Sequence, residues 1–156
     1  MYQRILVAID GSRTAHHAFD AALALATQNG AELCACHVIE NAAIYYNVPG
    51  YDPSVLRDQL VAQGEQIVQE FKQRIAAAGV KGSVTFSEAS ALSDVAAVVL
   101  DAARNFQADL LVLGTHGRRG FKRLVLGSVA EQCLRQADLP MLLIPAAAHP
   151  DTRAGA

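Results

Sequence analysis

The sequence lacks the features of several specialised classes of protein. No unbroken apolar run approaches the roughly 18 residues that a transmembrane helix requires, although 52% of the 156 residues are hydrophobic. The first residues show none of the charged, apolar and small-residue zones of a secretory signal. A net charge of −2 provides no general attraction to nucleic acid. We therefore expect a cytoplasmic protein that binds neither membranes nor nucleic acids.

Cysteine is also scarce, which argues against a disulfide-stabilised fold. The chain has three cysteines, Cys34, Cys36 and Cys133, an odd number in a sequence without an export signal. Cys34 and Cys36 precede His37, and such ligands suit a metal, but alternation along a strand places both thiols on one face and leaves the site short of ligands. We expect reduced thiols buried in the core.

What the sequence does contain is an alternation of short apolar runs with longer amphipathic segments. Runs rich in Val, Ile and Leu predict strands over residues 4–9, 31–39, 83–87, 110–113 and 141–144. Apolar residues three and four apart predict helices over 15–26, 53–79, 95–106 and 128–137, and Asp52 with Pro53 is typical of a helix start. This pattern predicts one α/β domain over 1–145 and a disordered tail over 146–156.

Topological rules narrow the arrangement of the five strands. Right-handed crossovers and short connections favour a doubly wound parallel sheet in the order 3-2-1-4-5, with helices on both faces. In this order the connections of strands one and four leave in opposite directions, so a crevice opens at their carboxyl ends, where ligands bind in such sheets. Asp10 and Gly114 are expected at that crevice.

The segment from Gly114 to Ser128 has the composition of a phosphate-binding loop. It contains four glycines and leads from the fourth strand into the last helix. Glycines let backbone N–H groups approach an oligophosphate, and the first turn of a helix adds unpaired donors at the positive end of its dipole. The loop matches neither the P-loop pattern nor G-x-G-x-x-G, so it predicts an anion site without naming the ligand.

The spacing of these glycines resembles that of one family. Gly114-x2-Gly117-x9-Gly127-Ser128 is similar to the phosphate signature of ATP-binding universal stress proteins, and Asp10-Gly11-Ser12 is similar to their opening motif. The resemblance covers about residues 3–145 and implies ATP, together with Mg²⁺, as the ligand. It implies that Asp10 lies by the ribose and phosphates, Val38 by adenine and the glycines by the phosphates. The expected nucleotide-binding residues are Ala8, Asp10, Val38, Gly114, His116, Gly117, Arg118, Gly127, Ser128 and Val129.

Several of these residues also have simpler interpretations. Ser128 and Glu131 fit an S-x-x-E capping box, and Asp10 fits the cap of the first helix. His116 is either a general base or phosphate acceptor, or a hydrogen-bonding residue of the loop. Arg118 belongs to four positive charges in six residues, which either attract the nucleotide or are simply solvated. No residue is assigned a catalytic role.

Three functions remain open from the sequence. The resemblance favours a nucleotide-responsive homodimer in a stress response, in which ATP stabilises the folded state that binds it. The alternatives are a slow ATPase or autophosphorylating enzyme, and a dimer that binds proteins without nucleotide. A homodimer is expected because residues 139–144 form an edge strand with free hydrogen-bonding groups, and a separate protein partner is left open.

Overall fold

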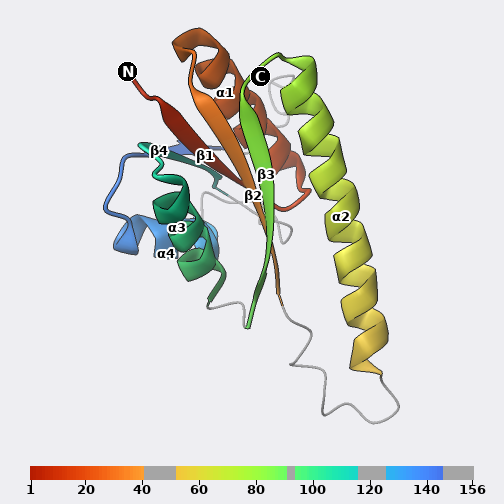
Figure 1. The fold of residues 1–156 in the computed structure, drawn as a ribbon. Coiled ribbons are helices and arrows are strands. Elements are labelled where there is room, and N and C mark those ends of the chain that lie inside the picture. Colours follow the sequence, from red (N-terminus) through yellow and green to blue (C-terminus); the bar gives the residue numbers. More distant parts are fainter. Residues whose placement is uncertain (41–51, 91–93, 116–125, 146–156) are drawn as a thin grey trace, which may run out of the picture.

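The computed structural model describes residues 1–40, 52–90, 94–115 and 126–145, with strands and helices that alternate along the chain (Figure 1). Strands β1 and β5 have the bounds expected from the sequence, and the others differ by a few residues. None of the helices in these segments is long and apolar enough to cross a membrane. The elements are β1 (Arg4–Ile9), α1 (Arg13–Asn29), β2 (Glu32–Glu40), α2 (Pro53–Ala77), β3 (Gly82–Ala89), α3 (Val95–Phe106), β4 (Leu110–Gly114), α4 (Ser128–Gln136) and β5 (Met141–Ile144).

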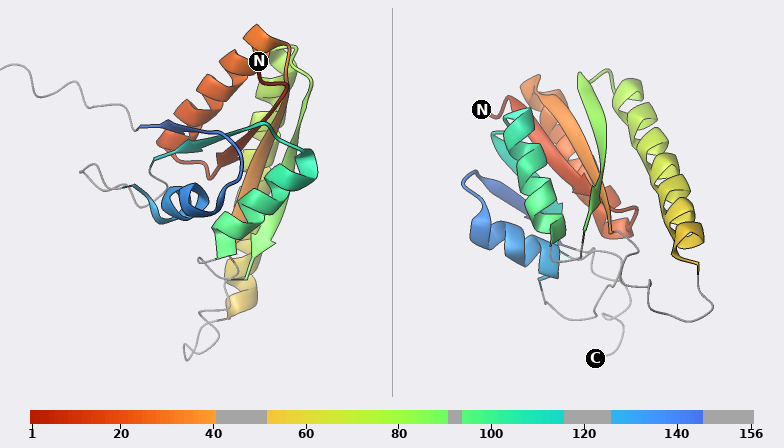
Figure 2. Two further views of the ribbon diagram at one scale, coloured as in Figure 1. Left: turned by 90° about the vertical axis from the view of Figure 1, so that its left-hand side faces the viewer. Right: turned by 60° about the horizontal axis from the view of Figure 1, so that its bottom comes forward.

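The strands form a single parallel sheet in the order β3-β2-β1-β4-β5, which confirms the predicted topology. In the central strand β1, Ile5, Leu6 and Val7 are fully buried because helices cover both faces of the sheet. Residues of α1 and α2 belong to the apolar cluster on one face, and residues of α3 and α4 to the cluster on the other. Figure 2 gives two further views of this arrangement.

Aromatic side chains anchor α1 and α2 on their face of the sheet. Phe19 of α1 and Phe71 of α2 are fully buried and meet edge to face, with ring centroids 4.5 Å apart. Arg74 of α2 lies over both rings and forms an ion pair with Asp20 of α1. These contacts set the position of α2 beside α1, and therefore beside the turn that precedes α1.

Side chains and a glycine define the ends of α1 and α2. Ser12 caps α1 by accepting from the backbone N–H of Ala15 (3.1 Å), and Gly30 ends that helix with a φ of 63°. Asp52 caps α2 by accepting from the N–H of Ser54, 2.9 Å away. The helix start that the sequence indicated at Asp52 is thereby confirmed.

Strand β3 is longer than the sequence indicates. It spans Gly82–Ala89 rather than 83–87, and all of it pairs with β2. As an edge strand it exposes most of its side chains, so it lacks the continuous apolar run that marks a buried parallel strand. Backbone pairing with β2 determines its length instead.

The cysteines are buried thiols, as expected. Cys34, Cys36 and Cys133 lie in the cluster between the sheet and helices α3 and α4, and each is at most 1% exposed. The two cysteines of β2 point to the same face, as strand alternation requires. Among the described residues, no group of His, Cys, Asp or Glu side chains is placed to hold a metal ion.

Candidate functional site

The carboxyl ends of β1 and β4 separate at the expected switch point. β1 pairs with β2, and β4 with β5, up to the last residue of β1 and of β4. Between β1 and β4, pairing ends at Val7↔Val112, two residues before either strand ends. The gap between these two strand ends is the place where doubly wound sheets bind ligands.

The turn that follows β1 is organised around Asp10. The backbone N–H of Ser12 donates to Oδ1 of Asp10 (2.9 Å), and Ser12 itself caps α1. The interpretation of Asp10 as the cap of the first helix is therefore wrong. Gly11 has a φ of 76°, and a Cβ there would lie 2.8 Å from Cδ1 of Ile67 in α2. This turn needs glycine and lies directly against α2.

Ala8 and Val38, which the resemblance places near the nucleotide, lie on one face of the sheet. Both are half-buried and pack against the cluster that includes α3 and α4. His37 alternates to the other face, where its ring is buried and stacks on Phe86 with centroids 5.6 Å apart. The Nδ1–H of His37 donates to the carbonyl oxygen of Ile9 (2.9 Å). This ring therefore supports the end of β1 from the face opposite Ala8 and Val38.

Helix α4 begins beside the end of β4. The backbone N–H of Gly127 donates to the carbonyl oxygen of Thr115 (2.7 Å), and the N–H of Thr115 donates to that of Ile144 (2.9 Å). These bonds hold both ends of the glycine-rich segment against the carboxyl edge of the sheet. Gly114 and Gly127 therefore lie at the same edge as Asp10.

The first turn of α4 starts without a capping side chain. Its N-cap is Gly127, with Ser128 as the first helical residue, and the described part of the chain provides no side-chain cap there. Glu131 accepts instead from Nη2 of Arg135 (2.9 Å). The capping-box interpretation of Ser128 and Glu131 is therefore wrong. A helix start of this kind offers backbone N–H groups and the positive end of its dipole to an anion.

The ten residues expected to bind nucleotide fall into three sets. Three lie outside the described residues: His116, Gly117 and Arg118. Four come together at the ends of β1 and β4 and the start of α4: Asp10, Gly114, Gly127 and Ser128. The other three pack against the cluster of the α3 and α4 face: Ala8, Val38 and Val129.

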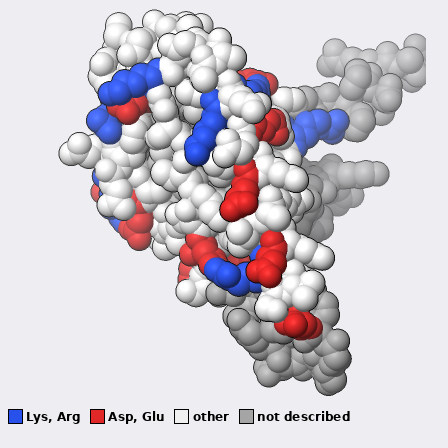
Figure 3. Space-filling model, turned by 45° about the vertical axis from the view of Figure 1, so that its right-hand side comes forward, with Lys and Arg blue, Asp and Glu red and all other residues white. Residues whose placement is uncertain are grey.

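Charged side chains of both signs are interspersed on the surface shown in Figure 3. Several pair across elements, including Arg57 with Glu88 (3.0 Å) and Lys81 with Glu32 (3.2 Å). This mixture agrees with the net charge of −2. In the described segments, the backbone donors of α4 are therefore a better source of attraction for an anion than the surface drawn in that view.

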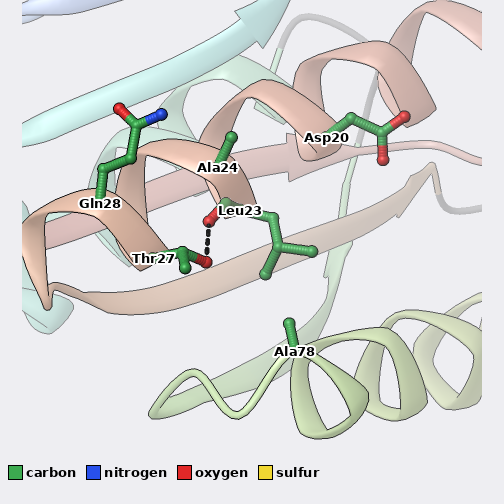
Figure 4. Close-up of a pocket in the computed structure, with 6 residues that line it drawn as sticks. All are labelled: Asp20, Leu23, Ala24, Thr27, Gln28 and Ala78. Carbon is green, nitrogen blue, oxygen red and sulfur yellow. Dashed lines mark hydrogen bonds between the residues drawn. The ribbon is translucent and has the colours of Figure 1, made fainter.

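A hollow of about 380 Å³ lies elsewhere, between α1 and the C-terminal end of α2 (Figure 4). Because α1 starts at the carboxyl end of β1 and runs back along the sheet, its C-terminal half lies toward the amino ends of the strands. The hollow is therefore remote from Asp10 and does not coincide with the switch point. Its lining residues are Asp20, Leu23, Ala24, Thr27, Gln28 and Ala78.

Two histidines support the site in ways not identified from the sequence, where His37 was weighed only as a metal ligand. His37 holds the carbonyl group that immediately precedes Asp10, and His16 of α1 bonds to Ser12 and to Glu70 of α2. The available signals were a histidine within an apolar strand and another beside the apolar stripe of a helix. Neither signal reveals which distant atoms the rings contact.

Comparisons with known proteins indicate one family for this fold and site. The model of the universal stress protein family matches residues 1–145. The universal stress protein YxiE of Bacillus subtilis is 29% identical over 151 residues, covering 92% of this chain and 99% of YxiE. A solved structure from the universal stress protein family of Burkholderia pseudomallei is 41% identical, with a TM-score of 0.77, and covers 93% of this chain and 97% of that one. A universal stress protein solved in complex with cAMP is 25% identical, with a TM-score of 0.66, over 92% and 97% of the two chains.

Proposed function

The chain belongs to the universal stress protein family, and from this we propose that it binds ATP with Mg²⁺ at the carboxyl ends of β1 and β4. In this proposal the protein is a cytoplasmic homodimer whose role in a stress response depends on the bound nucleotide. The observation that carries the proposal is the start of α4, where glycine rather than a side chain caps the helix beside the separated strand ends. Backbone N–H groups in that position suit a phosphate.

The two sides of the crevice suit different parts of a nucleotide. Gly127 has no side chain of its own before the first turn of α4, so phosphate oxygens can approach its backbone. Across the crevice, the carboxylate of Asp10 would repel a bare phosphate at short range. It suits instead a ribose hydroxyl, or a Mg²⁺ ion and its waters, because both are attracted to carboxylate oxygens.

The base has an apolar surface available nearby. Ala8 and Val38 are half-buried on the face that α3 and α4 cover, and a flat adenine ring can pack against such side chains. A related universal stress protein, 25% identical over most of both chains, is known in complex with cAMP, which carries the same base. This relative supports an adenine nucleotide, and the glycine spacing supports a polyphosphate such as ATP.

The test is a calorimetric titration of nucleotide-stripped protein with ATP and Mg²⁺. Gly127→Val places a branched side chain between the phosphates and the first-turn N–H groups. We expect saturable binding in the wild type and at least about tenfold weaker binding in the variant, equal to about 1.4 kcal/mol of binding free energy. ADP, AMP and cAMP titrated in parallel rank the ligands.

A matched control separates lost contacts from lost folding. Ala78→Val adds methyl groups at an exposed position beside the remote hollow and should leave the affinity unchanged. Binding that survives Gly127→Val, or a wild-type protein that binds no adenine nucleotide, contradicts the proposal. Phosphate release in the same samples, compared with Gly127→Val, tests the alternative of a slow ATPase.

The homodimer belongs to the same proposal and is attributed to β5. All four residues of this edge strand, Met141–Ile144, are apolar and only half-buried. Their side chains pack partly on the cores of both sheet faces, and one side of the strand has no neighbouring strand in the described chain. A second copy of β5 would cover this edge across a two-fold axis.

A further inference from the structure

His16 joins the turn after β1 to helix α2. Its Nδ1 lies 2.8 Å from the carbonyl oxygen of Ser12, and its Nε2 lies 2.9 Å from Oε1 of Glu70. Ser12 closes the turn that contains Asp10, since its backbone N–H donates to the Asp10 carboxylate. The imidazole of His16 therefore bridges the ligand end of α1 and the side of α2.

Both ring nitrogens of His16 face hydrogen-bond acceptors. A backbone carbonyl and an ionised carboxylate have no proton to donate, so only the imidazolium form, with N–H groups at both nitrogens, makes both bonds. A neutral ring must direct a lone pair at one of the two oxygens and lose that bond. The bridge is therefore complete only when His16 is protonated.

The charged groups around His16 come from both helices. The hydrogen bond from His16 to the Ser12 carbonyl has the largest effect and raises the pKa of the ring. Partial burial lowers this pKa, whereas the hydrogen bond to Glu70 and the negative charge of that carboxylate raise it. Arg74 of α2 disfavours the charged ring but is itself paired with Asp20 of α1. The net result is a pKa raised above the usual 6.5.

A second contact holds the same turn on α2. Gly11 lies against Ile67, where a Cβ on the glycine would meet Cδ1 of the isoleucine at 2.8 Å. Ile67 and Glu70 are three residues apart and so lie on the same side of α2. The turn around Asp10 is thus held on one helix at two points, one apolar and one that depends on a proton.

We propose that protonated His16 is a positioning residue that ties the turn from Asp10 to Ser12 onto α2 and strengthens nucleotide binding in mildly acidic solution. This inference rests on the proposed function, because the nucleotide at Asp10 is the ligand that it concerns. As pH rises through the pKa of His16, the ring loses a proton and one of its two bonds. The turn gains freedom, and affinity falls.

The test measures the dissociation constant of ATP with Mg²⁺ between about pH 5.5 and pH 8.5. His16→Gln removes the titrating ring, Glu70→Gln keeps an acceptor but removes its charge, and His17→Gln changes the neighbouring histidine as a control. We expect affinity to fall roughly two- to fivefold more across this range in the wild type than in His16→Gln, the effect of one partly exposed ion pair. ATP also changes its protonation over this pH range, but that contribution is the same for every variant and cancels when their pH profiles are compared.

Two readouts distinguish this role from a purely structural one. A structural role would weaken binding equally at every pH, whereas the proposal requires Glu70→Gln to shift the midpoint of the pH profile downward. An NMR titration of the His16 ring gives the reciprocal measurement, because nucleotide must raise the pKa of His16 by the logarithm of the same factor.

The outcomes separate this proposal from the proposed function. A wild-type pH profile shared by His17→Gln, flattened in His16→Gln and shifted in Glu70→Gln supports the role of His16. Identical profiles in the wild type and His16→Gln overturn that role and leave nucleotide binding intact. Failure of the wild type to bind at any pH overturns both proposals.

Discussion

The three thiols differ from ordinary cysteines because of where each side chain is buried. Burial raises the pKa of Cys36 and of Cys133 to about 11, and it raises that of Cys34 despite bonds from neighbouring hydroxyl groups. The thiolate is the reactive form, so at pH 8 about one thiol in a thousand is ionised at Cys36 or Cys133. We expect native protein to resist an alkylating reagent at pH 8 for as long as the fold stays closed, as followed by mass spectrometry.

Unfolded protein is the control for this experiment. In concentrated urea all three thiols should be labelled at the rate of free cysteine, because the burial that suppresses ionisation is lost. Labelling of the native protein at a comparable rate would contradict the placement of these side chains between the sheet and α3 and α4.

At the scale of elements, strand β3 is held by two close approaches of glycine. A Cβ on Gly82 would overlap the backbone carbonyl of Leu33 in β2, whereas a Cβ on Gly64 of α2 would overlap the ring of Phe86 in β3. The carbonyl is fixed by the sheet, whereas Phe86 is 37% exposed and its ring can turn away. Cδ2 of His37, 3.3 Å from the same added Cβ, needs only a small shift. Alanine in the helix also recovers about 1 kcal/mol of helix propensity.

These two glycines give a paired prediction about packing. We expect Gly82→Ala to lower the free energy of unfolding by about 1–3 kcal/mol, the usual cost of forcing atoms into a filled site. Gly64→Ala should cost less, because side-chain movement and helix propensity offset the overlap. Urea denaturation of both variants measures the difference. If both variants lose the same free energy of unfolding, or if Gly64→Ala loses more, the contact of Gly82 with the Leu33 backbone is not the more restrictive of the two.

The elements also show what the sequence could and could not predict. The bounds of β1 and β5 were predicted because apolar runs mark both strands, and the start of α2 was predicted because Asp52 caps it. The ends of β3 were missed because an edge strand is defined by pairing with β2 rather than by its own composition. Long-range pairing of this kind leaves no local pattern to detect.

The candidate site was also predicted only in part. Glycine spacing and strand order predicted which segments meet at the carboxyl edge, because both are properties of the chain and of general topology. Two details depended on distant contacts and were not predictable. The alternative interpretation of Ser128 as a cap was wrong, because Gly127 is the N-cap of α4 and its N–H bonds to Thr115, at the other end of the glycine-rich segment. The support from His16 needs α2 beside α1, which only the packed core provides.

At the scale of the whole molecule, the sheet of the described residues has two edge strands of different character, β3 and β5. β3 exposes most of its residues and carries hydroxyl and charged side chains among them, which discourages association with another strand. β5 is short and wholly apolar, and all four of its residues are only half-buried. The two edges therefore serve as test and control for the proposed dimer.

Bonds already made within the sheet show which groups of β5 are left for a partner. The backbone N–H of Leu111 donates to the carbonyl oxygen of Pro140, and that of Thr115 donates to the carbonyl oxygen of Ile144. The backbone N–H and C=O groups of the even-numbered residues of β5 therefore point toward β4. Leu143 therefore directs its N–H outward, and proline is tolerated at such a position of an edge strand. By the same reasoning, the bond from Leu33 to the carbonyl of Lys81 makes Val84 an outward residue of β3.

These positions give a matched pair of proline variants. We expect wild-type protein to sediment as a dimer at micromolar concentration and Leu143→Pro to weaken the dimer about thirtyfold. Because the two-fold axis places the substitution in both copies, two hydrogen bonds are lost from the interface, each worth about 1 kcal/mol. Val84→Pro removes an outward N–H from the opposite edge and should leave the dimer intact. A wild-type monomer, or a dimer sensitive to Val84→Pro but not to Leu143→Pro, would exclude β5 as the interface, because that edge would then contribute no pairing energy.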